Sequence, residues 1–300
     1  MIFLSLSAGQ SFVAEIGRSL TAKYEKYKAG SPEKLSNFAC LTIDVERMEG
    51  SSSYEAVRSD VRRMLDLITP FCLATFFVTG EVAENCPEVV KDIVNSGHEV
   101  GCHGMWHEKF DTFNRAEQSQ RIVRATEQIA ECAGQRPRGF RAPQHRANAE
   151  TLQVLEELDY LYDSSVLPKT PFMRPEIRKK LRFLKAPNHP YYPSRTDITK
   201  RGNCRVLELP CSTFFLPFMS SLTIRSNGMS DLLARILAHR KWPIIYYLHS
   251  YDNTITKRDL DWLTRLIAYL REKSSLVMMQ DLTKTCMEVF GSTEESLPVV

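Results

Sequence analysis

The residues best suited to chemistry in this chain are carboxylates and histidines that stand where short apolar runs end. Asp44 and Glu46 close one such run, and His103 and His107 follow another with the spacing HxxxH. Residues i and i+2 of an extended strand point to the same side, so both carboxylates can project into the same site. Residues i and i+4 face the same way on a helix or tight helical turn, so both imidazoles can reach one ion. We therefore predict a divalent-metal site built from these four side chains.

This combination of side chains indicates hydrolytic chemistry. One carboxylate with two histidines is a common ligand set for catalytic zinc, and it leaves a coordination position open. A second carboxylate that does not bind the ion can act as a base on water. Taken singly, an acidic residue after a strand is often a helix N-cap, and an HxxxH pair is often a pair of surface histidines. The two signals together favour a metal site.

Three more ionisable residues end apolar runs: Arg141 in FRAPQH, Asp163 in YLYD and His249 in YYLHSYD. A guanidinium can orient a carboxylate through a two-pronged contact. The alternative for Arg141 is a surface ion pair, which contributes little. His249 is either a satisfied core histidine or a group that protonates a leaving amine.

The elements that must position these residues alternate along the chain. Apolar runs rich in β-forming residues lie at 38–44, 72–79, 98–103, 139–142, 160–163, 205–211, 243–250 and 275–280. Segments of helical period lie between them, at 54–68, 87–95, 115–133, 149–158, 230–240 and 257–272. Strand alternating with helix implies parallel strands with right-handed crossovers, which close most naturally as a barrel. The working residues of such a barrel sit at the carboxyl ends of its strands.

The remaining segments define the predicted domain organisation. We predict an N-terminal extension over 1–35 with a helix near 14–27, a barrel domain over 36–290, and a C-terminal tail over 291–300. The segment 167–204 holds six prolines and reads as a long irregular excursion from the barrel. Long loops of this kind are often functional.

Composition excludes some classes of protein. The 300 residues are 43% apolar and 25% charged, and the formal net charge of +3 gives no nucleic-acid footprint. No run approaches the ~18 apolar residues of a membrane span. The start MIFLSLSAGQSFVA lacks a basic n-region, and eight irregularly spaced cysteines include no CxxC motif. We predict reduced core thiols and a cytoplasmic protein, with an exported form left open. No particular oligomeric state is predicted.

The site residues, in this order, resemble the polysaccharide deacetylase family (NodB-homology domain, carbohydrate esterase family 4). Five motifs carry the resemblance over roughly 38–285, namely TIDVE at 42–46, HGMWH at 103–107, RAP at 141–143, YDSS at 162–165 and LH at 248–249. The resemblance implies a distorted, incomplete (β/α)7 barrel. Val45 separates the two carboxylates of the first motif, whereas most members have them adjacent. The D-x-E spacing resembles a subgroup of exopolysaccharide-locus, peptidoglycan deacetylase-like and allantoinase-like proteins, some of which dispense with metal.

The resemblance also implies a role for each site residue. Asp44 takes the position of the catalytic base, held by Arg141. Glu46, His103 and His107 take the positions of metal ligands, with Zn²⁺ the expected ion. His249 takes the position of the general acid, tuned by Asp163. The residues expected to contact substrate are Trp106, Pro143, His145 and Leu248, the last beside the acyl pocket; Tyr191, Tyr192 and Tyr251 are further candidates.

The predicted function is metal-dependent hydrolysis of an amide that removes an acetyl group from an N-acetylated sugar or glycan precursor. One alternative is an allantoinase-like or imidase-like hydrolase that opens a small cyclic amide. Another is a barrel whose site has decayed and that only binds carbohydrate. The predicted partner is thus an N-acetylated carbohydrate or a related small-molecule amide.

Overall fold

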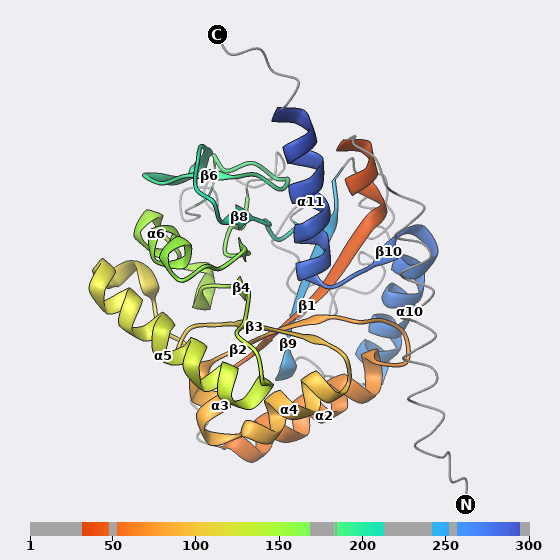
Figure 1. The fold of residues 1–300 in the computed structure, drawn as a ribbon. Helices are drawn as coiled ribbons and strands as arrows, with labels where there is room; N and C mark the ends of the chain where they lie inside the picture. The colour runs from red at the N-terminus through yellow and green to blue at the C-terminus, as the bar shows by residue number, and fades with distance from the viewer. Residues whose placement is uncertain are drawn as a thin grey trace, which may run out of the picture.

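The computed structural model describes residues 32–47, 53–168, 183, 185–212, 242–251 and 257–294. Several predictions fall outside these residues: the helices at 14–27 and 230–240, most of the N-terminal extension, the end of the tail, and much of the excursion at 167–204. The predicted domain boundaries stay predictions. In what is described, the fold is a parallel sheet curled into a half-barrel with helices around it (Figure 1).

Eight parallel strands form the curled sheet. They are β1 (Phe38–Val45), β2 (Thr75–Val78), β3 (Glu99–Cys102), β4 (Gly139–Phe140), β5 (Tyr162–Asp163), β8 (Leu207–Glu208), β9 (Ile244–His249) and β10 (Ser275–Leu276). Their order is β10-β1-β2-β3-β4-β5-β8, and β9 also pairs with β1. Ser212, after β8, exchanges two hydrogen bonds with Ile245 of β9, which brings the ends of the sheet together. The predicted incomplete barrel is confirmed.

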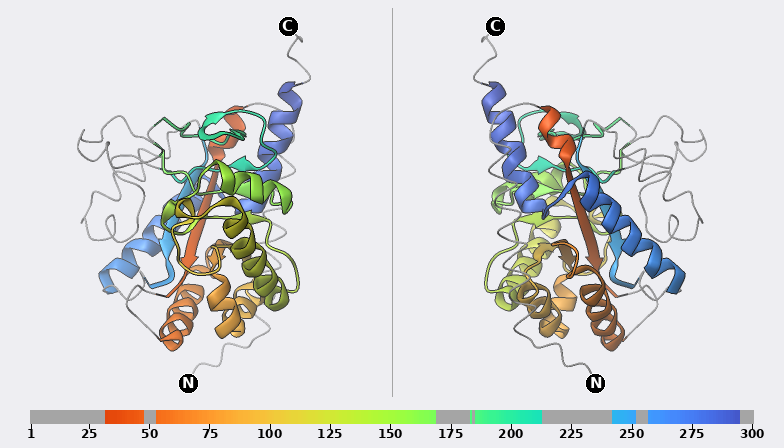
Figure 2. Two further views of the ribbon diagram at one scale, coloured as in Figure 1. Left: turned by 90° about the vertical axis from the view of Figure 1, so that its left-hand side faces the viewer. Right: turned by 90° about the vertical axis from the view of Figure 1, so that its right-hand side faces the viewer.

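The helices connect the strands, and all but the last of those described cover the outside of the sheet (Figures 1 and 2), whereas the last contributes to the inner core. They are α2 (Tyr54–Ile68), α3 (Gly80–Asn85), α4 (Pro87–Asn95), α5 (Arg115–Ala133), α6 (Ala149–Glu157), α10 (Lys257–Lys273) and α11 (Met279–Glu294). Local sequence explains their ends. Asn114 and Glu117 form a capping box at the start of α5, and Gly134 ends that helix in the left-handed conformation. None of the described helices is long and apolar enough to cross a membrane.

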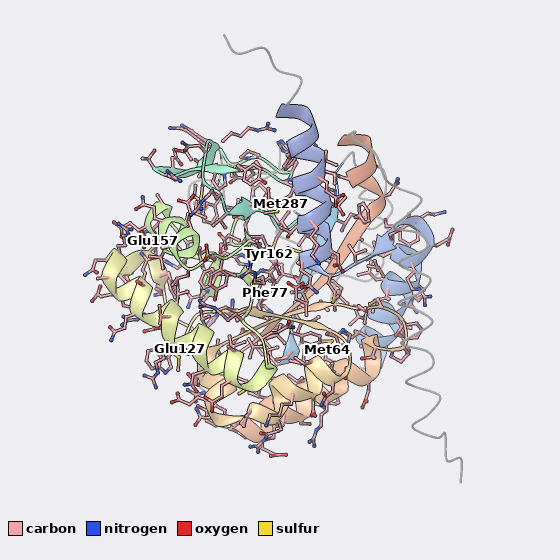
Figure 3. All side chains as sticks on the ribbon, in the orientation of Figure 1. Met64, Phe77, Glu127, Glu157, Tyr162 and Met287 are labelled. Atoms are coloured by element: carbon pink, nitrogen blue, oxygen red, sulfur yellow. The ribbon has the colours of Figure 1, made fainter. Side chains whose placement is uncertain are left out.

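Side-chain alternation along the strands produces two cores. Along β1, Phe38 and Cys40 point into the barrel, whereas Ala39, Leu41 and Ile43 point outward to the helices. Phe77 and Tyr162 belong to the inner core and lie at the centre of the molecule (Figure 3). The inner face of each strand therefore leads, at its carboxyl end, to side chains that face a common mouth.

Two segments differ from the sequence-based expectations. The apolar run 275–280 forms only the two-residue strand β10, and helix α11 then begins at Met279. Short apolar runs do not distinguish strand from buried helix, so periodicity failed here. Part of the predicted irregular excursion forms a hairpin of β6 (Pro193–Ser194) and β7 (Asp197–Arg201). The cysteines that the structure describes are free thiols and nearly all are buried; the cytoplasmic location stays a prediction.

A substitution at Gly139 tests the packing of the inner core. A Cβ at this position would overlap the ring and hydroxyl of Tyr162 on the neighbouring strand. We expect Gly139→Ala to lower the free energy of unfolding by about 3 kcal/mol, as measured by urea denaturation. The control is Gly291→Ala in α11, where the added Cβ meets nothing within 4 Å and helix propensity should stabilise the chain slightly. Equal stability of the two variants would contradict this packing.

Candidate active site

The predicted site residues gather at the carboxyl ends of neighbouring strands. Asp44 on β1 pairs in register with His249 on β9. His103 follows β3, and its amide donates to the carbonyl of Val78 at 2.9 Å. Arg141 follows β4, and its amide donates to the carbonyl of Cys102 at 2.9 Å. The backbone pairing of the sheet thus brings together residues as far apart as Asp44 and His249, which are 205 positions apart in sequence.

Arg141 is the fully buried cation of the site. Its Nη1 donates to Asp44 Oδ1 at 2.7 Å and to Thr42 Oγ1 at 2.9 Å. Its Nε and Nη2 donate to the carbonyl and hydroxyl of Ser164 at 3.1 and 3.0 Å, and the guanidinium lies over the ring of Phe77. The contact with Asp44 is made by one nitrogen, rather than the predicted two-pronged contact, because Ser164 engages the other two.

The charge of Arg141 decides the ionisation of Asp44. Burial alone would raise the pKa of the Asp44 carboxyl, but Arg141, with smaller contributions from His103 and His249, lowers that pKa to about 2. Asp44 is therefore an ionised carboxylate that is only 3% exposed. A carboxylate that is ionised at neutral pH and held in place by Arg141 can accept a proton from a water molecule in the site.

Glu46, His103 and His107 form a cluster of possible metal ligands. One donor atom from each lies within 4.8 Å of the others. Nε2 of His103 is 4.0 Å from Glu46 Oε2 and 3.9 Å from Asp44 Oδ2, and Nε2 of His107 is 4.0 Å from Glu46 Oε1. These separations exceed hydrogen-bond lengths. Ligand atoms that converge at such separations around one point suit a shared cation.

The protonation of His103 supports the same interpretation. Its Nδ1 lies 2.8 Å from the carbonyl oxygen of Arg141 and must therefore carry the proton. Burial lowers the pKa of His103 to about 4, so the imidazole is neutral and its Nε2 lone pair faces the carboxylates. Metal-binding histidines are commonly oriented in this way by a hydrogen bond from the other ring nitrogen. A carboxylate and two neutral imidazoles are a donor set that fits a divalent ion such as Zn²⁺.

The HxxxH prediction was right about proximity and wrong about its cause. Residues 103–107 form a bent loop, not a helical turn. Gly104 has φ +74°, and a Cβ there would press on Phe110 and Pro143, so the loop turns sharply between the two histidines. The two imidazole centroids nevertheless lie 5.6 Å apart.

His249 stands on the other side of Glu46. Its Nε2 is 3.9 Å from Glu46 Oε1, and its ring stacks on Tyr251 at a centroid distance of 4.8 Å. The hydroxyl of Tyr251 donates to Glu46 Oε1 at 3.2 Å. Since 16% of the His249 side chain is exposed, the imidazole borders both the cluster and solvent.

The structure corrects the predicted role of Asp163. Tyr162 faces the barrel interior, so alternation along β5 turns Asp163 outward, away from the face that carries His249. Asp163 accepts from Ser165 Oγ at 2.6 Å and pairs in register with Glu208. Burial raises the pKa of Asp163 to about 6, and burial together with the nearby Asp163 carboxyl raises the pKa of Glu208 well above its usual range. Glu208 was not among the residues predicted from the sequence, although an acidic residue inside the apolar run 205–211 could have indicated it.

The four predicted substrate contacts lie in different settings. Leu248 is fully buried in the outer core, because alternation places it opposite His249, so it does not line the mouth. Trp106 packs against the same core with Arg124 over its ring. Pro143 is buried against the Gly104 turn. Only His145 lies among the charged groups of the site. Of the other candidates, Tyr191 is buried and donates to a backbone carbonyl, and Tyr192 packs on Phe290.

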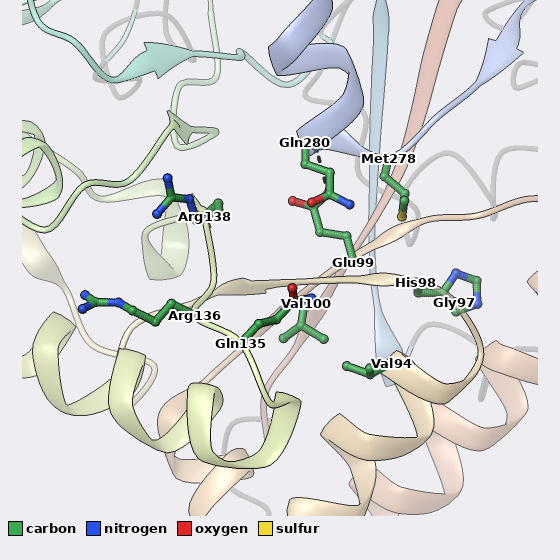
Figure 4. Close-up of a pocket in the computed structure, with 10 residues that line it drawn as sticks. All are labelled: Val94, Gly97, His98, Glu99, Val100, Gln135, Arg136, Arg138, Met278 and Gln280. Atoms are coloured by element: carbon green, nitrogen blue, oxygen red, sulfur yellow. Dashed lines mark hydrogen bonds between the residues drawn. The ribbon is translucent and has the colours of Figure 1, made fainter. Parts of the chain in front are cut away.

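A cavity of about 210 Å³ lies at the opposite, amino end of β3 (Figure 4). Glu99 borders it and accepts hydrogen bonds from Thr75 Oγ1, Tyr162 Oη and the Gln280 amide at 2.7, 2.8 and 3.0 Å. Arg136 and Arg138 line another side. Three donors satisfy the buried carboxyl of Glu99, which indicates a structural role for it.

Comparisons with known proteins define the class. Residues 52–162 match the polysaccharide deacetylase family model. A peptidoglycan deacetylase-like protein of Gibberella zeae is 33% identical over 119 residues, which are 39% of this chain and 35% of that protein. The peptidoglycan deacetylase of Helicobacter pylori is 32% identical over 108 residues, which are 36% and 37%. The chain thus spans about a third of the length of these relatives.

Solved structures share the fold. A protein of Mycobacterium smegmatis classed as a polysaccharide deacetylase aligns with a TM-score of 0.65 at 21% identity, over 85% of this chain and 91% of that one. PuuE allantoinase aligns with a TM-score of 0.62 at 17% identity, over 87% and 94%. Residues 52–162 of the chain are thus similar to the polysaccharide deacetylase family, and the fold is the one found in these solved structures. The matched segment holds His103, His107 and Arg141, and the structure adds Asp44 and Glu46 beside them.

The buried ion pair can be tested through stability. We expect Arg141→Met to lower the free energy of unfolding by about 3–5 kcal/mol in urea denaturation, because the Asp44 carboxylate is left buried with its charge uncompensated. Adding Asp44→Asn should recover part of the loss, since the double variant buries no lone charge. Arg136→Met, at the opposite end of the barrel, is the matched control and should change little. A double variant no more stable than Arg141→Met would contradict the pairing.

Proposed function

We propose that this site hydrolyses an amide with the help of a divalent metal ion, and that its reaction removes the acetyl group from an N-acetylated sugar. The observation that carries the proposal is the ionised Asp44 carboxylate, 3.9 Å from Nε2 of a neutral histidine in the Glu46–His103–His107 cluster. The relatives named as peptidoglycan deacetylases support the substrate class.

Glu46, His103 and His107 would hold the ion, for which we propose zinc. When bound, the ion supplies Lewis acidity toward the acyl oxygen and toward water. The neutral state of His103 matters because a protonated imidazole could not donate a lone pair. Its hydrogen bond to the Arg141 carbonyl keeps Nε2 directed at the cluster.

Asp44 would act as the base. As a water oxygen bonds to the acyl carbon, Asp44 takes one of the water protons, and Arg141 keeps its carboxylate in place. Because the pKa of Asp44 is low, the carboxylate is ionised throughout the physiological range and releases the proton readily afterwards.

His249 would act as the acid. When the carbon–nitrogen bond breaks, the departing nitrogen needs a proton, and the imidazole at the solvent edge of the cluster is placed to give it. Stacking on Tyr251 fixes the plane of the His249 ring. Acetate and the free amine are the products.

The base assignment gives the sharpest test of this function. Acetate release from N-acetylglucosamine oligomers, with cyclic ureides assayed beside them, should fall about 10²–10⁴-fold in Asp44→Asn. The substitution keeps the shape of the side chain and a hydrogen-bonding oxygen for Arg141. Glu99→Gln is the matched control, because it removes a buried carboxyl at the other end of the barrel and should leave turnover in place. Equal acetate release by wild type and Asp44→Asn would refute the assignment.

A further inference from the structure

His145 has an arrangement that the proposed hydrolysis does not use. Its Nδ1 lies 3.2 Å from the carbonyl oxygen of Ser165. A carbonyl only accepts, so Nδ1 carries the ring proton and Nε2 bears a lone pair. Within the described part of the chain, the buried Nε2 atom has no hydrogen-bond partner. A buried acceptor left unsatisfied costs about 1–3 kcal/mol, so such an atom calls for an explanation.

The charge state of this imidazole is settled by its surroundings. Burial lowers the pKa of His145 to about 3, and the positive charge of Arg141 adds to the effect. The ring is therefore neutral at physiological pH. A neutral imidazole with its proton on Nδ1 can only accept a hydrogen bond at Nε2.

The backbone at Gln144 and His145 is strained. Gln144 and His145 both have positive φ, 53° and 54°, which side-chain-bearing residues rarely adopt. Two such residues in succession persist only where the surroundings enforce them. Strain of this kind clusters at ligand-binding positions, where it holds a group ready for its partner.

Hydrogen bonds to Ser165 hold the backbone of this loop in its strained conformation. Its carbonyl accepts from His145, and its hydroxyl accepts from the Ala142 amide at 2.8 Å and donates to Asp163 at 2.6 Å. The outward-facing carboxyl pair of Asp163 and Glu208 thus anchors the RAPQH loop through Ser165. Tyr247 packs edge-on against the His145 ring, with centroids 5.0 Å apart, from the inner face of β9.

The position of His145 is beside the reacting groups and outside the metal cluster. Its imidazole is close enough to feel the charges of Arg141, Asp44 and His103. Asp44, the proposed base, is one of these charges. A substrate whose scissile amide reaches Asp44 would bring its neighbouring groups to His145.

We propose that Nε2 of His145 accepts a hydrogen bond from a donor group of the substrate next to the scissile amide, and that this contact determines specificity. The donor is a hydroxyl if the substrate is an acylated sugar, and a ring N–H if it is a cyclic ureide. The inference rests on the proposed function for the location of the amide. It adds the requirement that a donor, and not an acceptor or a methyl group, occupies this place.

The test couples one variant to a series of substrates. His145→Asn is chosen because asparagine tolerates positive φ, and its amide can keep the contact with the Ser165 carbonyl while lacking an acceptor at the Nε2 position. Turnover and affinity of the zinc-loaded full chain are measured with N-acetylglucosamine oligomers and their 3-, 4- and 6-deoxy forms, and with allantoin and its N-methyl derivatives. Thermal unfolding of the wild type and of His145→Asn checks that the fold is retained. His189→Asn serves as the control variant.

The expected result is that kcat/KM of His145→Asn falls about 10–100-fold with the substrate that carries the donor, which corresponds to about 1–3 kcal/mol. With the analogue that lacks that donor, wild type and variant should be equal. Equal losses with every substrate would overturn the inference, because they indicate a structural role, and so would the absence of any loss. A coupling seen only with the ureides would overturn the proposed sugar substrate and leave the inference standing. Failure of both substrate classes to bind would overturn both.

Discussion

Burying negative charge at the carboxyl end of β1 is the constraint on which the rest of the site depends. Asp44 and Glu46 are 3% and 2% exposed and lie two residues apart on the same inner face. An uncompensated buried carboxylate is costly, so positive charge must come from nearby elements. The guanidinium of Arg141, which directly follows β4, compensates Asp44. Glu46 instead faces three imidazoles, of His103, His107 and His249, whose Nε2 atoms lie 3.9–4.0 Å from its oxygens. We propose that a divalent cation among these atoms would supply the positive charge that Glu46 lacks.

The fold meets this constraint through two simple properties of parallel strands. Alternation separates an inner face, which carries Asp44, His103 and Arg141, from an outer face that packs on the helices. Parallel pairing then aligns the carboxyl ends, so that side chains from β1, β3, β4 and β9 reach one mouth. Two neighbouring serines hold residues of the site in place. Ser164 engages Arg141, while Ser165 engages the loop that carries His145.

Much of this could be predicted from the sequence, and the failures have identifiable physical causes. The positions of the strands, and the site residues at their ends, were predicted from apolar runs that end at ionisable side chains. The roles expected for Leu248 and Asp163 came from the family resemblance, and they do not agree with the alternation of side chains along the strands. Tyr247 and Tyr162 point inward, so the residues that follow them, Leu248 and Asp163, point outward. The HxxxH pair met through a glycine turn rather than a helix, which spacing alone does not reveal. The carboxyl pair of Asp163 and Glu208 joins strands 45 residues apart, counted from 163 to 208, and no local pattern predicts such a partner.

Zinc binding tests most directly whether Glu46, His103 and His107 hold a divalent ion. Calorimetric titration of the metal-free chain should show one Zn²⁺ bound per chain. His107→Ala, which removes a partly exposed proposed ligand with little effect on the core, should weaken that binding about 100-fold or more, since even indirect changes around a metal ligand cost 10–100-fold. His189→Asn, a histidine outside the cluster, should bind zinc like the wild type. If the wild type binds no zinc, or if His107→Ala binds it as tightly as the wild type, then Glu46, His103 and His107 do not hold the ion on which this account of the site depends.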